Sequence, residues 1–480
     1  MPQILGEDRN QLFMISLDAM IPEDDFVRVL DAFVDAIDMQ SFGFTQTVDK
    51  KDGRPYYPAQ VLMKLYLYGY HHGIRSSRKL EREASYNLQA MWLTGCRYPR
   101  YKTIADFRKN NAKAFRTVFR SFVKLLAKWE LVDGGLIAID SFKIRAQNSL
   151  KNNLNQNKID RHLEYIENKV AEYEEALNQA DQEEDKQALL AKIATQNQRK
   201  EGYEKLQEQL QQSGQEQISL TDADAKSVVL HRNIINVGYN IQASCDAKHK
   251  LLVEFETGQV NDTHALSEMA LATQEILQPE NMHVLADKGY HTGEELFVCK
   301  ENGITTFVSP KEPSTPQNSL YPVTDFIYNH TEDYYTCPAQ EKLSSNQAWL
   351  NHSGKNTPFR FKRYTTKACK YCKQRPACTK GKNGRAIDRS EYADSIEENK
   401  KRIQKDPDYY KLRQQITEHQ FGTLKRQRGF TFTLVKGKEK VLGEVGLVFI
   451  GYNLSRCGSI LKNKHLCKLL KTNSKYAYLN

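Results

Sequence analysis

Three carboxylates of this 480-residue chain stand where metal-assisted chemistry would need them. Asp140 ends an apolar run in GGLIAIDSFKIRA, Asp287 ends a second one in MHVLADKGYHTG, and Glu418 lies on a predicted helix. Carboxylate oxygens can hold two hard divalent cations about 3.5–4 Å apart, which activate an attacking oxygen and stabilise the leaving oxygen of a phosphodiester. The three residues together predict a two-metal site for phosphoryl transfer on nucleic acid.

Cationic side chains surround Glu418 in YKLRQQITEHQFGTLKRQRGF. Glu418 and Lys425 are seven positions apart, about two helical turns, so a regular helix places both on one face. Arg413 precedes Glu418 by five positions and shares that face only in part, and Arg426 follows Lys425. We expect these cations to bind phosphates while Glu418 holds metal. The alternative is a surface helix with ordinary salt bridges, which the shortage of matching acids disfavours.

The elements that must position these residues follow a mixed order. Short apolar runs predict strands, and longer periodic segments predict helices. The expected strands are 136–140, 238–246, 251–255, 283–287 and 305–309, and the expected helices are 265–277, 293–302, 407–428 and 440–470. A strand with Asp, a strand pair, a second strand with Asp and a late helix with Glu suit an α/β domain that resembles ribonuclease H. We predict this catalytic domain over 131–460.

Three further regions differ in composition and periodicity from the predicted catalytic core. Residues 1–130 read as helical, including one helix over 102–131, and fit either a DNA-binding domain or a plain helical bundle. Residues 150–215 are rich in Gln and Glu, with apolar residues three and four apart, which predicts an inserted helical hairpin. Residues 310–400 read as an irregular, basic, Cys-rich insertion, and 461–480 as a basic tail. The polar segment Val260–Leu266 is expected to form a turn, and the alternative is an approach to the metal site or to target DNA.

Four of the nine cysteines gather in the second insertion. Cys369 and Cys372 have the spacing of a metal knuckle, and Cys337 and Cys378 complete a candidate four-cysteine zinc site. The alternative is a set of reduced thiols without metal. Nine cysteines used in this way favour a reducing compartment over a disulfide scaffold.

The net charge of +10 is unevenly distributed. Residues 361–480 carry 28 Lys and Arg against 10 Asp and Glu, a net of +18, which leaves −8 for the remainder. A basic third of the chain is an electrostatic footprint for a polyanion such as nucleic acid. No apolar run approaches the roughly 20 residues of a membrane span, and the N-terminus does not read as a secretion signal. These features predict a cytoplasmic protein.

Together these motifs resemble a known family, the DDE transposases of bacterial insertion sequences that carry a Tyr-Arg-Glu-Lys signature. Tyr410, Arg413, Glu418 and Lys425 match that signature, except that four residues instead of three separate Arg413 from Glu418. IDSFKIRA resembles the strand of the first Asp, and ADKGY at Ala286–Tyr290 resembles the motif of the second. The resemblance extends to YPAQVLMKLYLYGY, GYNIQ and GYNLSRC, and so covers nearly the whole chain.

The resemblance implies an enzyme, its ligands and its partners. Such transposases bind terminal inverted repeats of double-stranded DNA, cut them and join the 3′ ends to target DNA with Mg²⁺ or Mn²⁺. It implies catalytic and metal-binding roles for Asp140, Asp287 and Glu418, and DNA contacts for Arg413, Lys425, Arg426 and Tyr410. A homodimer, associated with the bacterial nucleoid and not with a membrane, is expected because two ends must be joined. The competing classes are a nuclease of the same fold that only hydrolyses, a non-catalytic DNA-binding protein and, with least support, an RNA-processing enzyme.

Overall fold

A six-stranded mixed sheet forms the centre of the computed structural model, which describes residues 14–45, 56–231, 234–258, 260–311, 320–352 and 358–472. The strands lie in the order β4-β5-β1-β7-β8, and β6 also pairs with β5. Strand β5 is antiparallel to β1, β4 and β6, whereas β1, β7 and β8 are parallel. Their bounds are β1 Leu136–Arg145, β4 Lys226–His231, β5 Ile234–Asp246, β6 Leu252–Thr257, β7 Met282–Ala286 and β8 Ile304–Val308. All five predicted strands are present.

Helices cover both faces of this sheet. Parallel strands buried on both sides need continuous apolar runs, which β7 (MHVLA) and β8 (ITTFV) supply. On one face Leu285 and Phe307 pack against Ile416 of α13, and on the other Val284 joins the main core with Met269 of α9. The covering helices are α9 Leu266–Leu277, α10 Gly293–Glu301, α12 Ala393–Lys405 and α13 Pro407–Gly422. The mixed α/β architecture expected from the sequence is therefore present.

The N-terminal region is helical, as predicted, with a break inside the expected helix 102–131. Asn111 ends one helix, where its side-chain amide donates to Phe107 O and its Oδ1 accepts from Thr45 N, and the next helix begins at Ala112. Local hydrogen bonds of this kind are invisible to apolar periodicity. The helices are α1 Phe26–Asp35, α2 Ala59–His71, α3 Ser77–Tyr86, α4 Leu88–Thr94, α5 Tyr101–Asn110 and α6 Ala112–Lys128.

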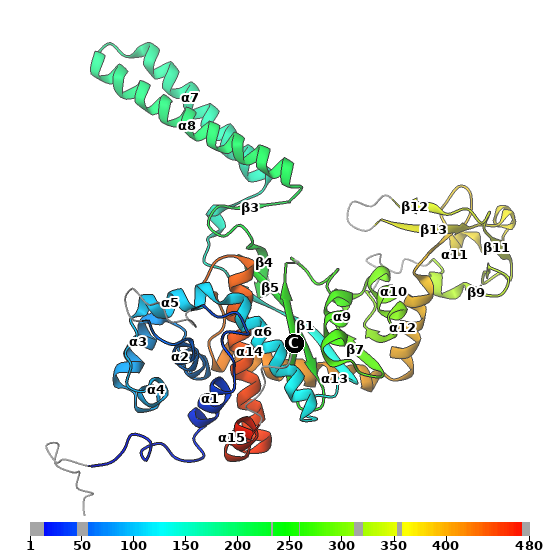
Figure 1. Ribbon diagram of the computed structural model, residues 1–480. Coiled ribbons are helices and arrows are strands. Elements are labelled where there is room, and N and C mark those ends of the chain that lie inside the picture. The colour runs from blue at the N-terminus through cyan, green and yellow to red at the C-terminus, as the bar shows by residue number, and fades with distance from the viewer. Residues whose placement is uncertain are drawn as a thin grey trace, which may run out of the picture.

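Helix α14 (Lys438–Leu461) runs between the N-terminal helices and the sheet (Figure 1). It packs against α2, α6 and β6, and most of its length is buried. The predicted single helix 440–470 is instead two helices, because α15 (Asn463–Thr472) follows and packs on α1. All of α15 lies within the predicted tail 461–480, whose residues 473–480 lie outside the described ranges. One continuous apolar core thus joins the two ends of the described chain.

A buried ionic cluster reinforces this junction. Glu444 of α14 is fully buried, and its Oε1 lies 2.8 Å from Arg75 Nη2, 3.8 Å from Arg108 Nη1 and 3.0 Å from Tyr70 OH. Its Oε2 accepts from Leu434 N at 2.9 Å. Buried charges persist only when they are paired and hydrogen-bonded. The cluster therefore fixes the N-terminal helices to α14.

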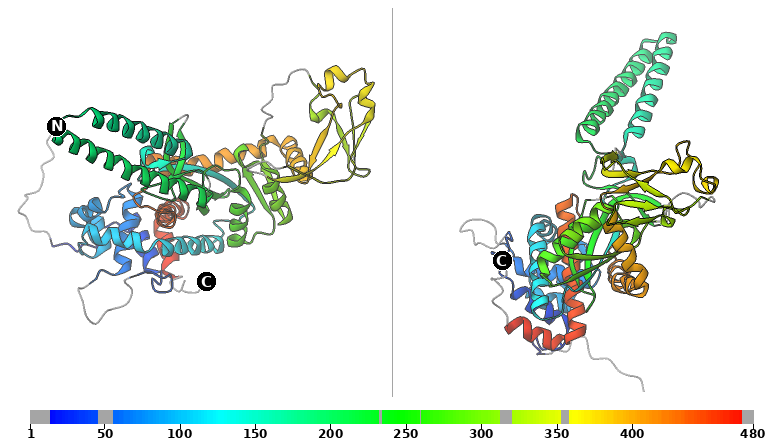
Figure 2. Two further views of the ribbon diagram at one scale, coloured as in Figure 1. Left: turned by 90° about the horizontal axis from the view of Figure 1, so that it is seen from above. Right: turned by 90° about the vertical axis from the view of Figure 1, so that its right-hand side faces the viewer.

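The predicted hairpin within 150–215 is present and projects away from the body (Figures 1 and 2). It consists of α7 (Gln156–Gln179) and α8 (Glu183–Ser213), closed at its base by the short strands β2 (Asn153–Leu154) and β3 (Ile218–Ser219). Its own small apolar cluster is centred on three buried residues near the base: Leu154, Ile159 and Leu210. The rest of the hairpin is largely exposed.

The segment 310–400 is not irregular as expected, because its described part contains two three-stranded antiparallel sheets and the start of α12. Most of the strands have only three or four residues, too few for alternation to show in the sequence. They are β9 Ile327–Asn329, β10 Tyr334–Thr336, β11 Lys342–Ser344, β12 Leu350–His352, β13 Phe359–Tyr364 and β14 Ile387–Ser390. Figure 2 places this segment at the opposite end of the sheet from the N-terminal helices. No described helix is long and apolar enough to cross a membrane.

Candidate active site

Asp140 and Asp287 occupy matching positions on neighbouring parallel strands. Strands β1 and β7 are in register from Leu136 opposite His283 to Ala138 opposite Leu285. Two residues further along the same register come Asp140 on β1 and Asp287 directly after β7. Because side chains alternate along a strand, both aspartates belong to the α13 side of the sheet, as Ala138 and Leu285 do.

Asp140 is held by groups from its own strand and from α13. Its Oδ2 accepts from Arg413 Nη1 at 2.9 Å and from Thr417 Oγ1 at 3.1 Å, and its Oδ1 accepts from Ser141 N at 2.8 Å. Burial raises the pKa of Asp140, and the charge of Asp287 adds to the rise. The Arg413 guanidinium opposes this change. The carboxylate is therefore placed beside a like charge, which the Arg413 cation offsets in part.

Asp287 both ends a strand and begins a turn. Its Oδ1 accepts from Gly289 N at 2.6 Å and caps the short turn Lys288–Tyr290. Asp287 therefore caps a turn and also lies beside Asp140 in the strand register. A Cβ on residue 289 would come within 2.8 Å of Asp287 Oδ1, so glycine at this position leaves room for the hydrogen bond from Gly289 N to that oxygen.

A further carboxylate, Asp262, lies beside Asp287 and was not predicted. A Cβ on Gly289 would be 2.8 Å from Asp287 Oδ1 and 3.3 Å from Asp262 Oδ2, so these oxygens are no more than about 6 Å apart. Asp262 Oδ1 accepts from two buried amides of β5, Asn240 Nδ2 at 2.9 Å and Gln242 Nε2 at 2.7 Å. Its segment, Val260–Leu266, was interpreted as a turn in preference to the alternative, an approach to the metal site or target DNA. The one sequence signal for Asp262 was its position in a polar segment after a predicted strand.

Tyr290 is a buried residue that packs next to these carboxylates. Its side chain is fully buried, and its hydroxyl donates to Gln242 Oε1, whose amide also donates to Asp262. Burial raises the pKa of Tyr290, and the charges of Asp262, Asp140 and Asp287 raise it further. One neutral hydroxyl thus lies among three acidic groups contributed by three different segments.

Glu418 does not join these residues in the structure. It is exposed on α13, one position after Thr417, so its side chain is turned by roughly 100° from the side that contacts Asp140. Among the described residues, three or more potential ligand atoms lie within 4.8 Å of one another only at His330, Asp394 and Glu397. Arg389 already pairs with Asp394 and Glu397, so that group is a surface ion-pair cluster.

The predicted phosphate-binding residues are divided between the site and its surroundings. Arg413 pairs with Asp140, whereas Tyr410 is half-buried against the apolar cluster under α13 and Arg426 is exposed. Lys425 lies in a π-helical turn, Thr423–Gln427, so the regular two-turn spacing from Glu418 that the sequence predicted does not hold. Burial lowers the pKa of Lys425, Lys143 lowers it further, and the charge of Asp140 opposes the shift.

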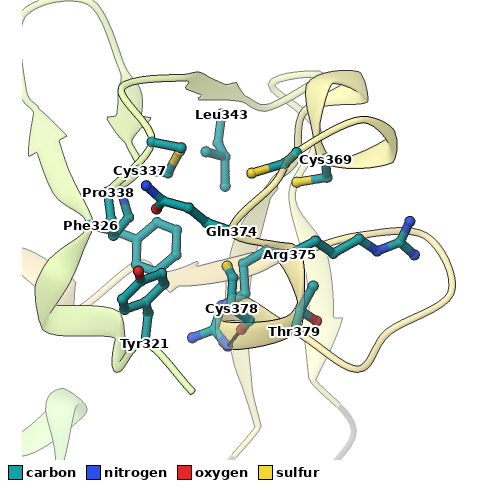
Figure 3. Close-up of a pocket in the computed structure, with 13 residues that line it drawn as sticks. Tyr321, Phe326, Cys337, Pro338, Leu343, Cys369, Gln374, Arg375, Cys378 and Thr379 are labelled. Atoms are coloured by element: carbon teal, nitrogen blue, oxygen red, sulfur yellow. Dashed lines mark hydrogen bonds between the residues drawn. The ribbon is translucent and has the colours of Figure 1, made fainter. Parts of the chain in front are cut away.

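The four predicted zinc cysteines lie around one small pocket in the β9–β14 segment. Figure 3 shows Cys337, Cys369 and Cys378 approaching it from three separate stretches of chain, and Cys372 also lines it. Burial raises the pKa of the Cys378 thiol, the nearby Arg385 opposes the shift, and the other three cysteines add to it. The fold therefore brings the four predicted cysteines to one pocket, in which no three of their sulfurs lie within 4.8 Å of one another.

Comparisons with known proteins identify the class. A family model described as a transposase domain (DUF772) matches residues 15–110, and one described as a transposase DDE domain matches residues 336–457, which include Glu418. No curated protein matches the chain at a significant level. Both matched regions are therefore similar to transposase families, the class that the motifs of the chain predicted.

One solved structure is similar over most of the chain. It is the piggyBac transposase in its synaptic complex with hairpin DNA, with 9% sequence identity and a TM-score of 0.35. The match covers 94% of this chain and 80% of that one. A likeness at this level carries no argument about the residues of the present site.

Proposed function

We propose that this chain is the transposase of a bacterial insertion sequence. It binds the terminal inverted repeats of double-stranded DNA, nicks each end and transfers the freed 3′ ends to target DNA. The observation that carries the proposal is the register of Asp140 and Asp287 on adjacent parallel strands, with the helix of Glu418 laid across them. The strand order and directions are those expected of a ribonuclease H-like core, and support that fold.

The donor set fits hard divalent cations. Asp140 and Asp287 offer carboxylate oxygens side by side, and their mutual repulsion is relieved when a cation binds between like charges. Asp140, Asp287 and Glu418 would hold Mg²⁺ or Mn²⁺, and Glu418 must turn toward the other two to do so. The ions, when bound, supply activation of the attacking oxygen and stabilisation of the leaving one.

The chain's own residues position the DNA. In the first step a water oxygen attacks phosphorus and the 3′ oxygen leaves as a hydroxyl. In the second that hydroxyl attacks a target phosphate in line, and a target 3′ oxygen leaves. Lys425, Arg426 and Arg413 would bind the phosphate oxygens, and Tyr410 would support the helix that carries them. The N-terminal helices would recognise the ends, and two protomers would bring two ends together.

A cleavage assay tests the proposal. The substrate is a labelled DNA end made from the inverted repeats that flank the gene, with Mg²⁺ present. We expect the wild type to cut it and to join it to a target plasmid, and Asp140→Asn, Asp287→Asn and Glu418→Gln each to lose about 100-fold or more while still binding. Asp408→Asn, on an exposed position of the same helix, is the matched control.

Each result separates the competing classes. Cutting by Glu418→Gln would show that Glu418 is not a catalytic residue. Cutting by Asp140→Asn or Asp287→Asn would contradict the assignment of the whole site. Cutting without joining identifies a nuclease that only hydrolyses. Binding without cutting in the wild type identifies a non-catalytic DNA-binding protein.

A further inference from the structure

The strongest feature outside the acidic site is the convergence of four cysteines on one pocket. Cys337 follows β10, and Cys378 ends the short helix α11 (Arg375–Cys378). Cys369 lies within the turn Lys367–Lys370, and Cys372 follows that turn by two residues. The cavity holds about 20 Å³, room for roughly one water-sized particle. It therefore suits a single ion and is too small for an organic ligand.

Two backbone segments that border the pocket lie close to the cysteine sulfurs. Glu341 N donates to Cys337 Sγ at 3.4 Å, within a tight turn in which Gln340 N donates to Cys337 O at 2.8 Å. Gly384 has φ +90°, and a Cβ there would lie 2.6 Å from Cys369 Cβ and 3.2 Å from its Sγ. The loop through residue 384 can press against Cys369 only because that residue is glycine.

The pocket is also lined by a cation with an unused donor. Arg385 Nε is buried and has no hydrogen-bond partner among the described residues, and the side chain lines the same pocket. Further cations, Lys367, Lys370, Lys373 and Arg375, lie on the stretch that carries Cys369, Cys372 and Cys378. An unpaired buried donor is costly unless a partner is bound. A tetrathiolate metal site carries a net charge of about −2 and would offset these cations.

The segment that holds the cysteines has little core of its own. Five apolar residues are buried in the cluster between its two small sheets: Phe326, Tyr335, Leu343, Tyr364 and Ile387. Two of the cysteines, Cys337 and Cys378, pack against that cluster. A unit of roughly 70 residues with such a small core usually needs a metal or disulfides for stability. All nine cysteines of the chain are unpaired in the structure.

We propose that Cys337, Cys369, Cys372 and Cys378 bind one structural zinc ion that fastens the two small sheets to each other. Zinc prefers four thiolate sulfurs in closed structural sites, and its binding releases the four thiol protons to solvent. The four cysteines line the pocket from separate stretches of chain, and their sulfurs, no three of which lie within 4.8 Å of one another here, would close around the ion. The ion would thereby link the turn after β10 to the segment between β13 and β14. This proposal is independent of the catalytic one, because it concerns stability and metal content.

Metal analysis of the full chain tests the proposal. Protein purified with a reducing agent and without chelator is expected to contain about one zinc per chain, and Co²⁺ replacement is expected to give the absorption of tetrahedral thiolate coordination. The double variant Cys369→Ser, Cys372→Ser should lose both signals. Cys96→Ser, at an exposed cysteine of the N-terminal region, should keep both. A folded wild type with neither zinc nor the Co²⁺ spectrum overturns the proposal.

Thiol reactivity of the wild type decides the matter if the double variant fails to fold. Cys245, Cys299, Cys457 and Cys467 are buried, and Cys96 is exposed. With zinc bound, a thiol reagent should react rapidly with about one cysteine, and after chelation with about five. Equal reactivity before and after chelation contradicts the proposal, and so does a disulfide among the four cysteines in freshly purified protein.

Discussion

Arg413 Nη1 lies 2.9 Å from Asp140 Oδ2, so the helix that carries Glu418 supplies the cation that neutralises the first acidic residue of the candidate site. Both side chains are mostly buried, at 17% and 22% exposure. A divalent cation that binds Asp140 must either displace this guanidinium or share the carboxylate with it. Metal binding and the position of α13 are therefore coupled through one ion pair.

Replacing Arg413 is expected to strengthen metal binding. Arg413→Gln removes a cation that competes for Asp140, and an ion pair worth about 1 kcal/mol corresponds to roughly a fivefold change in affinity. Calorimetric titration with Mn²⁺ measures the change, and Arg426→Gln, an exposed arginine nearby, is the control. Weaker Mn²⁺ binding by Arg413→Gln would show that Arg413 orients Asp140 instead of competing for it.

Glu444→Gln is expected to destabilise the fold strongly. The change leaves Arg75 and Arg108 buried with no carboxylate, and breaking a buried ion pair from one side costs about 3–5 kcal/mol. Urea unfolding measures the loss. Glu439→Gln, on the exposed first turn of the same helix, should stay within about 0.5 kcal/mol of the wild type. Equal effects of the two changes would contradict a special contribution from the buried cluster.

The same glutamate predicts an acid-dependent loss of stability. Burial alone would raise the pKa of Glu444, but Arg108 and Arg75 lower it below its ordinary value. A carboxyl group with a lowered pKa stabilises the folded state above its unfolded pKa, about 4.3, and this contribution disappears as pH falls through the folded pKa. The stability difference between wild type and Glu444→Gln should hold from pH 8 to about 5 and shrink below about 4. A gap that does not shrink in acid would show that lost packing, and not charge, causes the effect.

Removing the hairpin is expected to leave the body folded. Its apolar cluster is separate from the main core, and β2 pairs with β3 at its base, so a short Gly-Ser linker can replace residues 160–209. The melting temperature of the body should change by no more than about 2 °C, within the range of a minor local change. Scanning calorimetry checks the fold, and gel-shift analysis with paired DNA ends shows whether the hairpin contributes to assembly. A collapse of the main transition would show that the hairpin supports the core.

Sequence patterns predicted the parts of the fold that rest on continuous apolar runs. The strands of Asp140 and Asp287 and the hairpin helices have clear periodicity or buried apolar runs, and all are present. The register of the two aspartates could not be read from the chain, because it depends on pairing between segments 147 positions apart. The place of Asp262 beside Asp287 could not be read from the chain for a related reason, since amide donors on β5 fix its position.

Other features of the fold could not be predicted because the spacing of apolar residues does not encode them. The strands between Ile327 and Ser390 are too short for alternation to be visible, and Asn111 divides two helices through side-chain hydrogen bonds. The side on which Glu418 lies depends on how α13 packs and on the π-helical turn that follows it, neither of which apolar spacing reveals. The cysteine cluster could be selected from residue type and spacing because thiols of this kind are rarely grouped by chance.

The position of α14 between the first helices and the sheet imposes a delay between the synthesis of the N-terminal helices and the completion of their core. Helix α6 ends at Lys128 and α14 begins at Lys438, so the partner that covers the N-terminal helices is translated roughly 300 residues after them. At about 5–20 residues per second, this interval is on the order of 15–60 s. During it the nascent helices keep an apolar face open to chaperones and to neighbouring chains. A ribosome that stalls before Lys438 would release a product unable to complete this core, because α14 would be missing.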